Sequence, residues 1–178
     1  MKETVARVIA AHHAKGKEFV AGGVRSFVLA EGEGEPIVLF HGIPASSFLY
    51  RKVIPRLAAR GFQALAFDLP GLGFSERPVD FDYTFAGLGR WAAQAVDALG
   101  VTRFHLVVHD AGGPVGFEMA ATMPERLRSL TILNTAIALS HLFEAARIIN
   151  SVHAGTETIS AADLDNLRRF FPLFLFNL

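Results

Sequence analysis

The stretch LVVHDAGGPVG (residues 106–116) carries the strongest indication of the fold in this sequence. Residues 106–109 are typical of a buried strand, and residues 111–123 are expected to form a helix that ends before Pro124. Asp110 lies between them, beside glycines that allow the backbone to turn sharply. An ionisable side chain at this junction is held clear of the sheet, so its presence there requires a chemical explanation.

Two roles are open to Asp110. In a nucleophile elbow, a reactive side chain projects from a sharp turn between a strand and a helix. The start of the following helix then directs free backbone N–H groups and a positive dipole end at the reacting atoms. The second role is structural, because Asp is a favoured N-cap residue and could cap the helix expected at residues 111–123.

Strands and helices alternate along the chain on both sides of this junction. Short apolar runs bounded by turn residues predict strands at residues 24–30, 37–40, 63–67, 104–109 and 127–133. Helical patterns with capping residues predict helices at residues 1–15, 46–60, 84–99 and 111–123. This alternation predicts an α/β fold with a mostly parallel sheet and helices on both faces.

The composition limits the class of protein. The chain has 178 residues, is 51% hydrophobic and has no net charge, which suits a globular domain and gives no reason to expect nucleic acid as a partner. It has no cysteine, which excludes disulfides and thiolate metal sites. The N-terminal residues lack a signal-peptide core, and no apolar run approaches the roughly 20 residues that span a bilayer. We expect a cytoplasmic protein with no membrane partner.

A second loop, HGIP at residues 41–44, also follows a buried strand. In a parallel sheet this loop shares an edge with Asp110. The backbone N–H groups of Ile43 and Ala111 are therefore expected to form an oxyanion hole around the group that Asp110 attacks. The other residues expected to support this geometry are His41, Gly42, Pro44, Gly112 and Gly113.

Three segments together resemble a known family. The HGIP loop, DLPGLGFSERP (residues 68–78) and VVHDAGGPVG (residues 107–116) resemble the α/β-hydrolase fold in their order and spacing. They look like the branch with an aspartate nucleophile, the haloalkane dehalogenases and epoxide hydrolases. The resemblance implies a hydrolase in which Asp110 attacks a small apolar alkyl halide or epoxide and forms an alkyl-enzyme ester. It implies no cofactor and no metal.

The same resemblance indicates what this chain lacks. In the family, the catalytic acid and the histidine base come later in the chain than the nucleophile. Residues 127–133 correspond to the sixth strand, and they are followed by Asn134 and Thr135 instead of a carboxylate. Residues 1–135 are interpreted as the N-terminal part of the hydrolase core, and residues 136–178 as the start of a helical cap. A chain that ends before the acid and the base is not expected to complete the catalytic cycle.

None of the seven histidines is expected to replace the missing base. They are His41 in the HGIP loop, His105 and His109 in the strand before Asp110, His12 and His13 on a surface helix, and His141 and His153 in the cap-like segment.

The substrate and even the enzymatic role stay open. Many haloalkane dehalogenases have a tryptophan directly after the nucleophile and some have an asparagine in the HGxP loop, whereas this chain has Ala111 and Ile43. The cap tyrosines that epoxide hydrolases use are also missing. An esterase-like hydrolase is one alternative. Another is a non-catalytic remnant or interaction protein that self-associates through its apolar end, FFPLFLFNL at residues 170–178.

Overall fold

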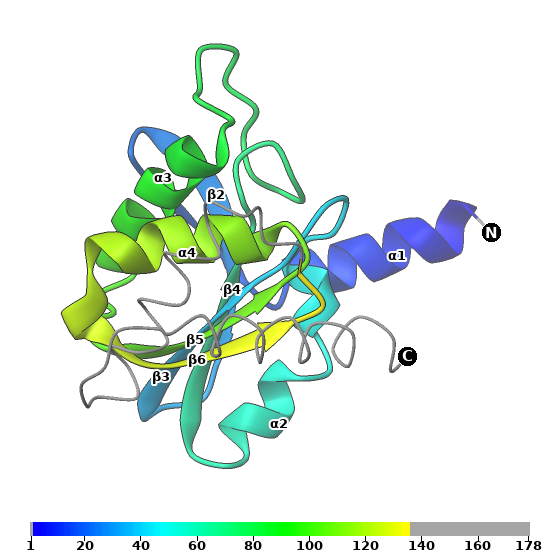
Figure 1. Ribbon diagram of the computed structural model, residues 1–178. Helices are drawn as coiled ribbons and strands as arrows, with labels where there is room; N and C mark the ends of the chain where they lie inside the picture. The colour runs from blue at the N-terminus through cyan, green and yellow to red at the C-terminus, as the bar shows by residue number, and fades with distance from the viewer. Residues whose placement is uncertain (1, 136–178) are drawn as a thin grey trace.

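The computed structural model describes residues 2–135, which form a six-stranded sheet with helices packed against it (Figure 1). The strand order is β1-β2-β4-β3-β5-β6. The strands are β1 (Lys17–Ala21), β2 (Val24–Glu31), β3 (Glu35–Phe40), β4 (Phe62–Phe67), β5 (Phe104–His109) and β6 (Leu127–Leu133). The described helices are α1 (Lys2–His13), α2 (Ile54–Ala58), α3 (Phe85–Ala98), α4 (Gly112–Thr122) and the short 3-10 helices η1 (Ser47–Tyr50) and η2 (Pro124–Arg126).

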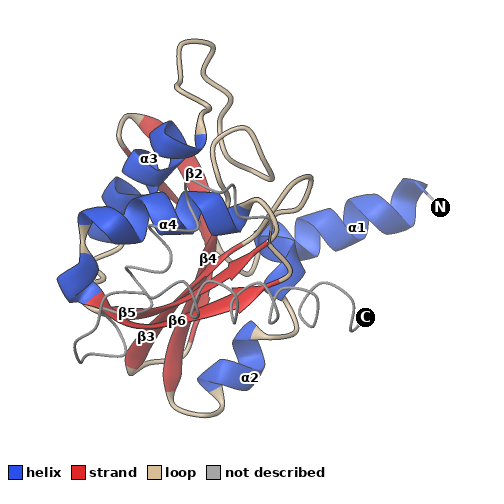
Figure 2. Cartoon of the chain, viewed as in Figure 1, coloured by secondary structure: helices blue, strands red, loops and turns tan. Residues whose placement is uncertain are grey.

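The strands β3 to β6 are parallel, whereas β1 and β2 are antiparallel to their neighbours. Helices α3 and α4 pack side by side on one face of the sheet, and α2 lies on the other face (Figure 2). The expected α/β class, with a mostly parallel sheet and helices on both faces, is confirmed. The interpretation of residues 136–178 as the start of a cap lies outside the described residues.

Alternating strand residues build a separate apolar core on each face of the sheet. In β3, Val38 and Phe40 join the core under α3 and α4, whereas Ile37 and Leu39 join the core on the α2 face. Trp91 of α3 is 2% exposed and its indole N–H donates to the carbonyl of Ala21 at 2.9 Å. Both faces of β3 and β4 are therefore buried towards the carboxyl ends of these strands, the edge of the sheet at which the candidate site lies.

Strand β1 is absent from the expectations drawn from the sequence. It is an edge strand whose residues are mostly exposed, so it lacks the apolar run by which the other strands are predicted. Gly22 and Gly23 join β1 to β2 with φ angles of 54° and 76°, the two positive values that a tight two-residue hairpin requires. This glycine pair was the available signal for the hairpin.

The helix expected over residues 46–60 is interrupted. The structure has η1 at its start and α2 at its end, with turns between them. Pro55 lies in the first turn of α2, where proline is tolerated, but it cannot donate the hydrogen bond that would continue a helix through it. Either Ser46 or Ser47 was expected to cap this segment, and the cap is Ser46, whose hydroxyl accepts a bond from Phe48 N–H at 3.3 Å.

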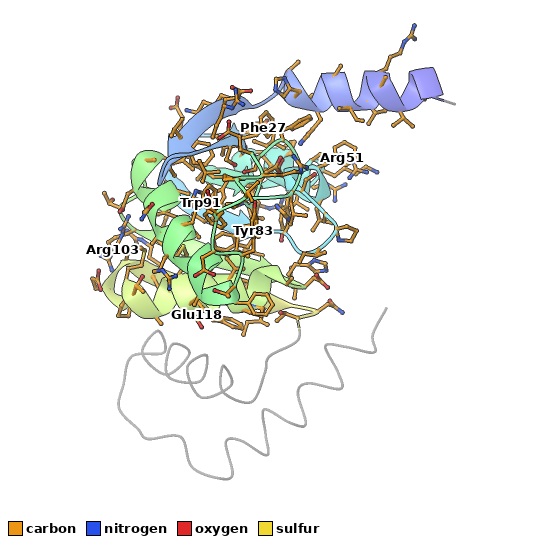
Figure 3. The ribbon with its side chains drawn as sticks, turned by 90° about the horizontal axis from the view of Figure 1, so that it is seen from above. Phe27, Arg51, Tyr83, Trp91, Arg103 and Glu118 are labelled. Atoms are coloured by element: carbon orange, nitrogen blue, oxygen red, sulfur yellow. The ribbon has the colours of Figure 1, made fainter. Side chains whose placement is uncertain are left out.

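The expectation that His12 lies at the surface is wrong, whereas His13 is exposed as expected. Helix α1 projects from the sheet, and its C-terminal end packs near Phe27 (Figure 3). His12 there is 6% exposed, with its Nε2 at 3.0 Å from the hydroxyl oxygen of Ser47. Burial lowers the pKa of His12, because a charged imidazole would lose its hydration.

None of the helices in residues 2–135 combines the length and the apolar character that a bilayer span requires.

Candidate active site

Asp110 lies at a sharp turn between β5 and α4. It follows directly after His109, the last residue of β5, and its φ angle is +53°, a left-handed value that residues with side chains rarely adopt. The N-cap of α4 is Ala111, and no side chain makes a capping bond there. The geometry is therefore that of an elbow with an exposed carboxylate, and the alternative role of Asp110 as the helix cap is wrong.

The carboxylate of Asp110 is bound by backbone N–H groups from two loops. Ile43 N–H donates to Asp110 Oδ1 at 3.0 Å. The pKa of Asp110 is lowered, first by a hydrogen bond from the Ala111 backbone and then, against the opposing effect of burial, by Ile43 and by the nearby His109. The structure therefore brings together Asp110, Ile43 and Ala111, and it stabilises the carboxylate in its ionised form.

Two glycines allow this close approach. A Cβ on Gly42 would lie 2.2 Å from Asp110 Oδ1, inside the space that the carboxylate occupies. A Cβ on Gly112 would lie 2.5 Å from the carbonyl oxygen of His41. Both positions exclude a side chain because the HGIP loop and the elbow are in direct contact. Pro44 follows Ile43 through a cis peptide bond in the same loop.

His41 is fully buried and has a structural part in the loop. Its Nδ1 lies 2.9 Å from the carbonyl oxygen of Gly42, and Leu69 N–H donates to its Nε2 at 3.2 Å. These partners assign the proton to Nδ1. Burial lowers the pKa of His41, so the ring is neutral and both of its nitrogens are bound. It links the HGIP loop to the start of the 68–78 loop.

A buried carboxylate, Asp68, holds the 68–78 loop in place. Its two oxygens accept bonds from Ser47 N–H at 2.6 Å and Phe74 N–H at 2.7 Å. Its backbone carbonyl accepts a bond from the hydroxyl of Ser26 at 2.6 Å. Asp68 therefore supports the loops around the elbow and does not contact Asp110 as a catalytic acid.

Two residues at the elbow, Asn134 and Thr135, are not predicted to contact Asp110 from the sequence. The hydroxyl of Thr135 donates to the backbone carbonyl of Asp110 at 2.5 Å, and Asp110 N–H donates to the carbonyl of Asn134 at 3.2 Å. In the sequence, Asn134 and Thr135 stand out only because neither is a carboxylate. Their contact with Asp110 depends on the register between β5 and β6, which pairs His109 with Leu133.

Within residues 2–135, no histidine nitrogen hydrogen-bonds the Asp110 carboxylate. His105 points its Nδ1 to the hydroxyl of Ser129, at 2.7 Å. His141 and His153 lie outside the described residues. The described part of the chain therefore holds a candidate nucleophile and a candidate oxyanion hole, and it places no base beside them.

A cavity of about 450 Å³ lies away from this centre, between α1 and the loops at residues 46–48 and 73–74. None of the residues that line it is Asp110, Ile43 or Ala111. The cavity and the bound carboxylate of Asp110 therefore lie in different parts of the structure. We place the candidate site at Asp110, because this residue combines an ionised carboxylate that is bound by backbone N–H groups with the geometry of an elbow.

A carboxylate held by backbone N–H groups, at an elbow on the carboxyl edge of a parallel sheet, defines the core of an α/β hydrolase. The comparison with family models agrees. The alpha/beta hydrolase fold family matches residues 35–169, and this chain belongs to that family.

Within the family, the chain is similar to haloalkane dehalogenases and to epoxide hydrolases. A haloalkane dehalogenase of Psychrobacter cryohalolentis is 36% identical over 117 residues, which are 64% of this chain and 39% of that protein. The structure of haloalkane dehalogenase DatA from Agrobacterium tumefaciens matches with a TM-score of 0.62 and 35% identity, over 68% of this chain and 41% of that one. Epoxide hydrolase VrEH1 from Vigna radiata matches with a TM-score of 0.65 and 31% identity, over 69% and 38%.

The matched region is only part of each relative. The chain spans between 36% and 44% of the length of the curated relatives with which it aligns. The fold and the family follow from these comparisons.

Proposed function

We propose that Asp110 is the nucleophile of a hydrolase that opens a carbon–halogen or epoxide bond through an alkyl-enzyme ester. The observation that supports it best is the contact between Asp110 Oδ1 and Ile43 N–H, at 3.0 Å, in a residue held at a left-handed φ. One carboxylate oxygen is bound in a fixed direction. The other, Oδ2, is therefore the oxygen assigned to attack the substrate.

The first step is a displacement at an sp³ carbon. Oδ2 forms a bond to that carbon, and the bond to the halogen or epoxide oxygen breaks with its electron pair leaving on the halide or the alkoxide. The lowered pKa of Asp110 keeps the attacking group ionised at neutral pH. Oδ1 becomes the carbonyl oxygen of the new ester while it stays beside Ile43 N–H.

The second step is attack by water on the ester carbon, Cγ. Negative charge then develops on Oδ1, which already lies against the N–H groups of Ile43 and Ala111, as an oxyanion hole requires. The bond from Cγ to Oδ2 breaks and releases the alcohol. This step needs a base to accept a proton from water, and residues 2–135 place none there. We therefore propose that residues 2–135 by themselves carry the reaction only as far as the ester.

The nature of the nucleophile favours alkyl over acyl substrates. Attack by a carboxylate on an acyl carbon forms an anhydride, whereas attack on an alkyl carbon forms a more stable ester. This distinction makes the esterase-like alternative the weaker one. The choice between halide and epoxide is open, because Ala111 and Ile43 carry apolar side chains that donate no hydrogen bond to a leaving group.

The test is alkylation followed by intact-protein mass spectrometry. The chain is incubated with bromohexane and, separately, with styrene oxide, and the modified residue is located by peptide mapping. We expect a lasting adduct on Asp110 and none in the Asp110→Asn variant, which keeps the size of the side chain but not its charge. The reagent that reacts faster identifies the substrate class. A folded wild-type chain without an adduct from either reagent would overturn the proposal.

A further inference from the structure

The backbone of Asp110 is bound on both sides by the two residues that follow β6. Its N–H donates to the carbonyl of Asn134 at 3.2 Å, and its carbonyl accepts a bond from the hydroxyl of Thr135 at 2.5 Å. Thr135 is 3% exposed, so this hydroxyl is shielded from water. A buried hydroxyl that donates to a carbonyl holds that peptide group in one orientation.

Gly113 completes the same arrangement. Its N–H donates to the carbonyl of Asp110 at 3.0 Å, so the oxygen accepts bonds from both Gly113 and Thr135. A Cβ on Gly113 would lie 1.9 Å from the hydroxyl oxygen of Thr135. The Thr135 hydroxyl thus occupies the space that a side chain at position 113 would fill, and it lies directly against the first turn of α4.

These contacts bear on a residue with an unfavourable backbone. Asp110 has a φ of +53°, and such conformations persist only where surrounding interactions determine them. The Asp110 backbone makes three hydrogen bonds that do so: it donates to Asn134 and accepts from Thr135 and Gly113. The direction of the carboxylate follows from this backbone. Ile43 N–H bonds to Oδ1 only when the backbone places the carboxylate in this position.

We infer that Thr135 is a positioning residue for the nucleophile, an inference that rests on the proposed role of Asp110. Its hydroxyl fixes the peptide between Asp110 and Ala111, and through it both the Ala111 N–H and the direction of Oδ2. Without the hydroxyl, this peptide rotates towards a less strained conformation. The carboxylate then loses part of its bonding to Ala111 and Ile43, and Oδ2 leaves the line of attack.

The test compares Thr135→Val, which keeps the branched shape and removes the donor, with Thr135→Ser, which keeps the hydroxyl. We expect the single-turnover alkylation of Asp110 by bromohexane to slow about 10- to 100-fold in Thr135→Val and to stay within about threefold of wild type in Thr135→Ser. Thr135→Ala is a second variant without the donor, in case Thr135→Val does not fold. Equal alkylation rates in wild type and in the folded variants without the hydroxyl would overturn the inference.

A second measurement separates this inference from the proposed function. The pKa of the Asp110 carboxyl is followed by its ¹³C shift in labelled protein, which needs no reaction. We expect this pKa to rise towards its ordinary value in Thr135→Val and to stay low in Thr135→Ser. A purely structural role would change unfolding but not this pKa. If wild type forms no adduct, the proposed function fails, and an unchanged pKa in Thr135→Val would overturn the positioning role by itself.

Discussion

Asp110 combines a carboxylate with a backbone conformation that suits glycine better. Its φ of +53° places it in the left-handed region, which costs a residue with a side chain roughly 1–2 kcal/mol. The carboxylate in return accepts bonds from Ile43 and Ala111, and the backbone is bound from the end of β6. Local stability is thereby given up for a carboxylate in a fixed direction, which is what the proposed nucleophile requires.

This strain predicts different stabilities for two truncations of Asp110. Asp110→Gly and Asp110→Ala both remove the carboxylate, but only glycine adopts the left-handed φ without strain. We expect Asp110→Gly to be more stable than Asp110→Ala by about 1 kcal/mol in urea denaturation. Equal stabilities of the two variants would mean that residue 110 is not strained.

Asp68 is predicted to matter for stability and not for chemistry. Its fully buried carboxylate accepts one bond on each oxygen, from Ser47 and Phe74. Asp68→Asn replaces one acceptor by an NH₂ that faces a backbone donor, so we expect a loss of about 2–3 kcal/mol in the free energy of unfolding. The matched control is Asp80→Asn at an exposed loop position, with an expected change within about 0.5 kcal/mol. A similar result for both variants would contradict the structural role of Asp68.

At the scale of elements, α1 is attached to the sheet mainly through its C-terminal turn. His12 anchors it by packing against the rings of Phe27 and Phe48 and by its contact with Ser47. Residues 4–11 of the helix are exposed, including Val5 and Ile9. Attachment at one end makes the docking of α1 sensitive to the charge of a single imidazole.

The pH dependence of stability follows from that imidazole. Burial lowers the folded-state pKa of His12 below the ordinary value of 6.5, so the unfolded chain binds protons more readily than the folded one. Stability is therefore greatest above pH 6.5 and falls as the pH is lowered towards the folded-state pKa. His41 changes stability in the same direction.

The measurement is the urea midpoint as a function of pH for wild type and for His12→Gln. Glutamine can still bond to Ser47 but does not titrate, so we expect a weaker pH dependence with the contribution of His41 left in place. A pH dependence of the same steepness in both proteins would show that His12 does not anchor α1.

On the scale of the whole molecule, the sequence of residues 170–178 still predicts association between copies. Six of the seven residues before the final Asn-Leu pair are Phe or Leu, and such a segment favours contact with another apolar surface. We expect light scattering to detect oligomers of the full chain, and the double variant Phe174→Asp, Phe176→Asp to shift them towards monomer. Monomeric wild-type protein would refute this prediction.

The arrangement of the molecule could be predicted where it depends on local pattern. The alternation of strands and helices predicted the parallel sheet, and a shared sheet edge predicted that Ile43 and Ala111 would meet Asp110. Strand β1 could not be found by apolar periodicity because its side chains are exposed. The sequence of the helix expected at residues 1–15 also does not indicate that His12 is buried.

The remaining features depend on contacts between distant segments. His12 is buried by the rings of Phe27 and Phe48, which lie 15 and 36 positions further along the chain. The contact of Thr135 with Asp110 depends on the pairing of β5 with β6. Residue type and spacing carry no information on such a register, so these contacts follow only from the three-dimensional structure.

The most direct test of the central claim counts bromide released from bromohexane per folded chain and locates the alkyl group. If Asp110 attacks while its Oδ1 stays in the oxyanion hole, the wild-type chain should release bromide with the alkyl group on Asp110, and Asp110→Asn should release none. Absence of bromide release from the folded wild-type chain, or an alkyl group on another residue, would contradict the account.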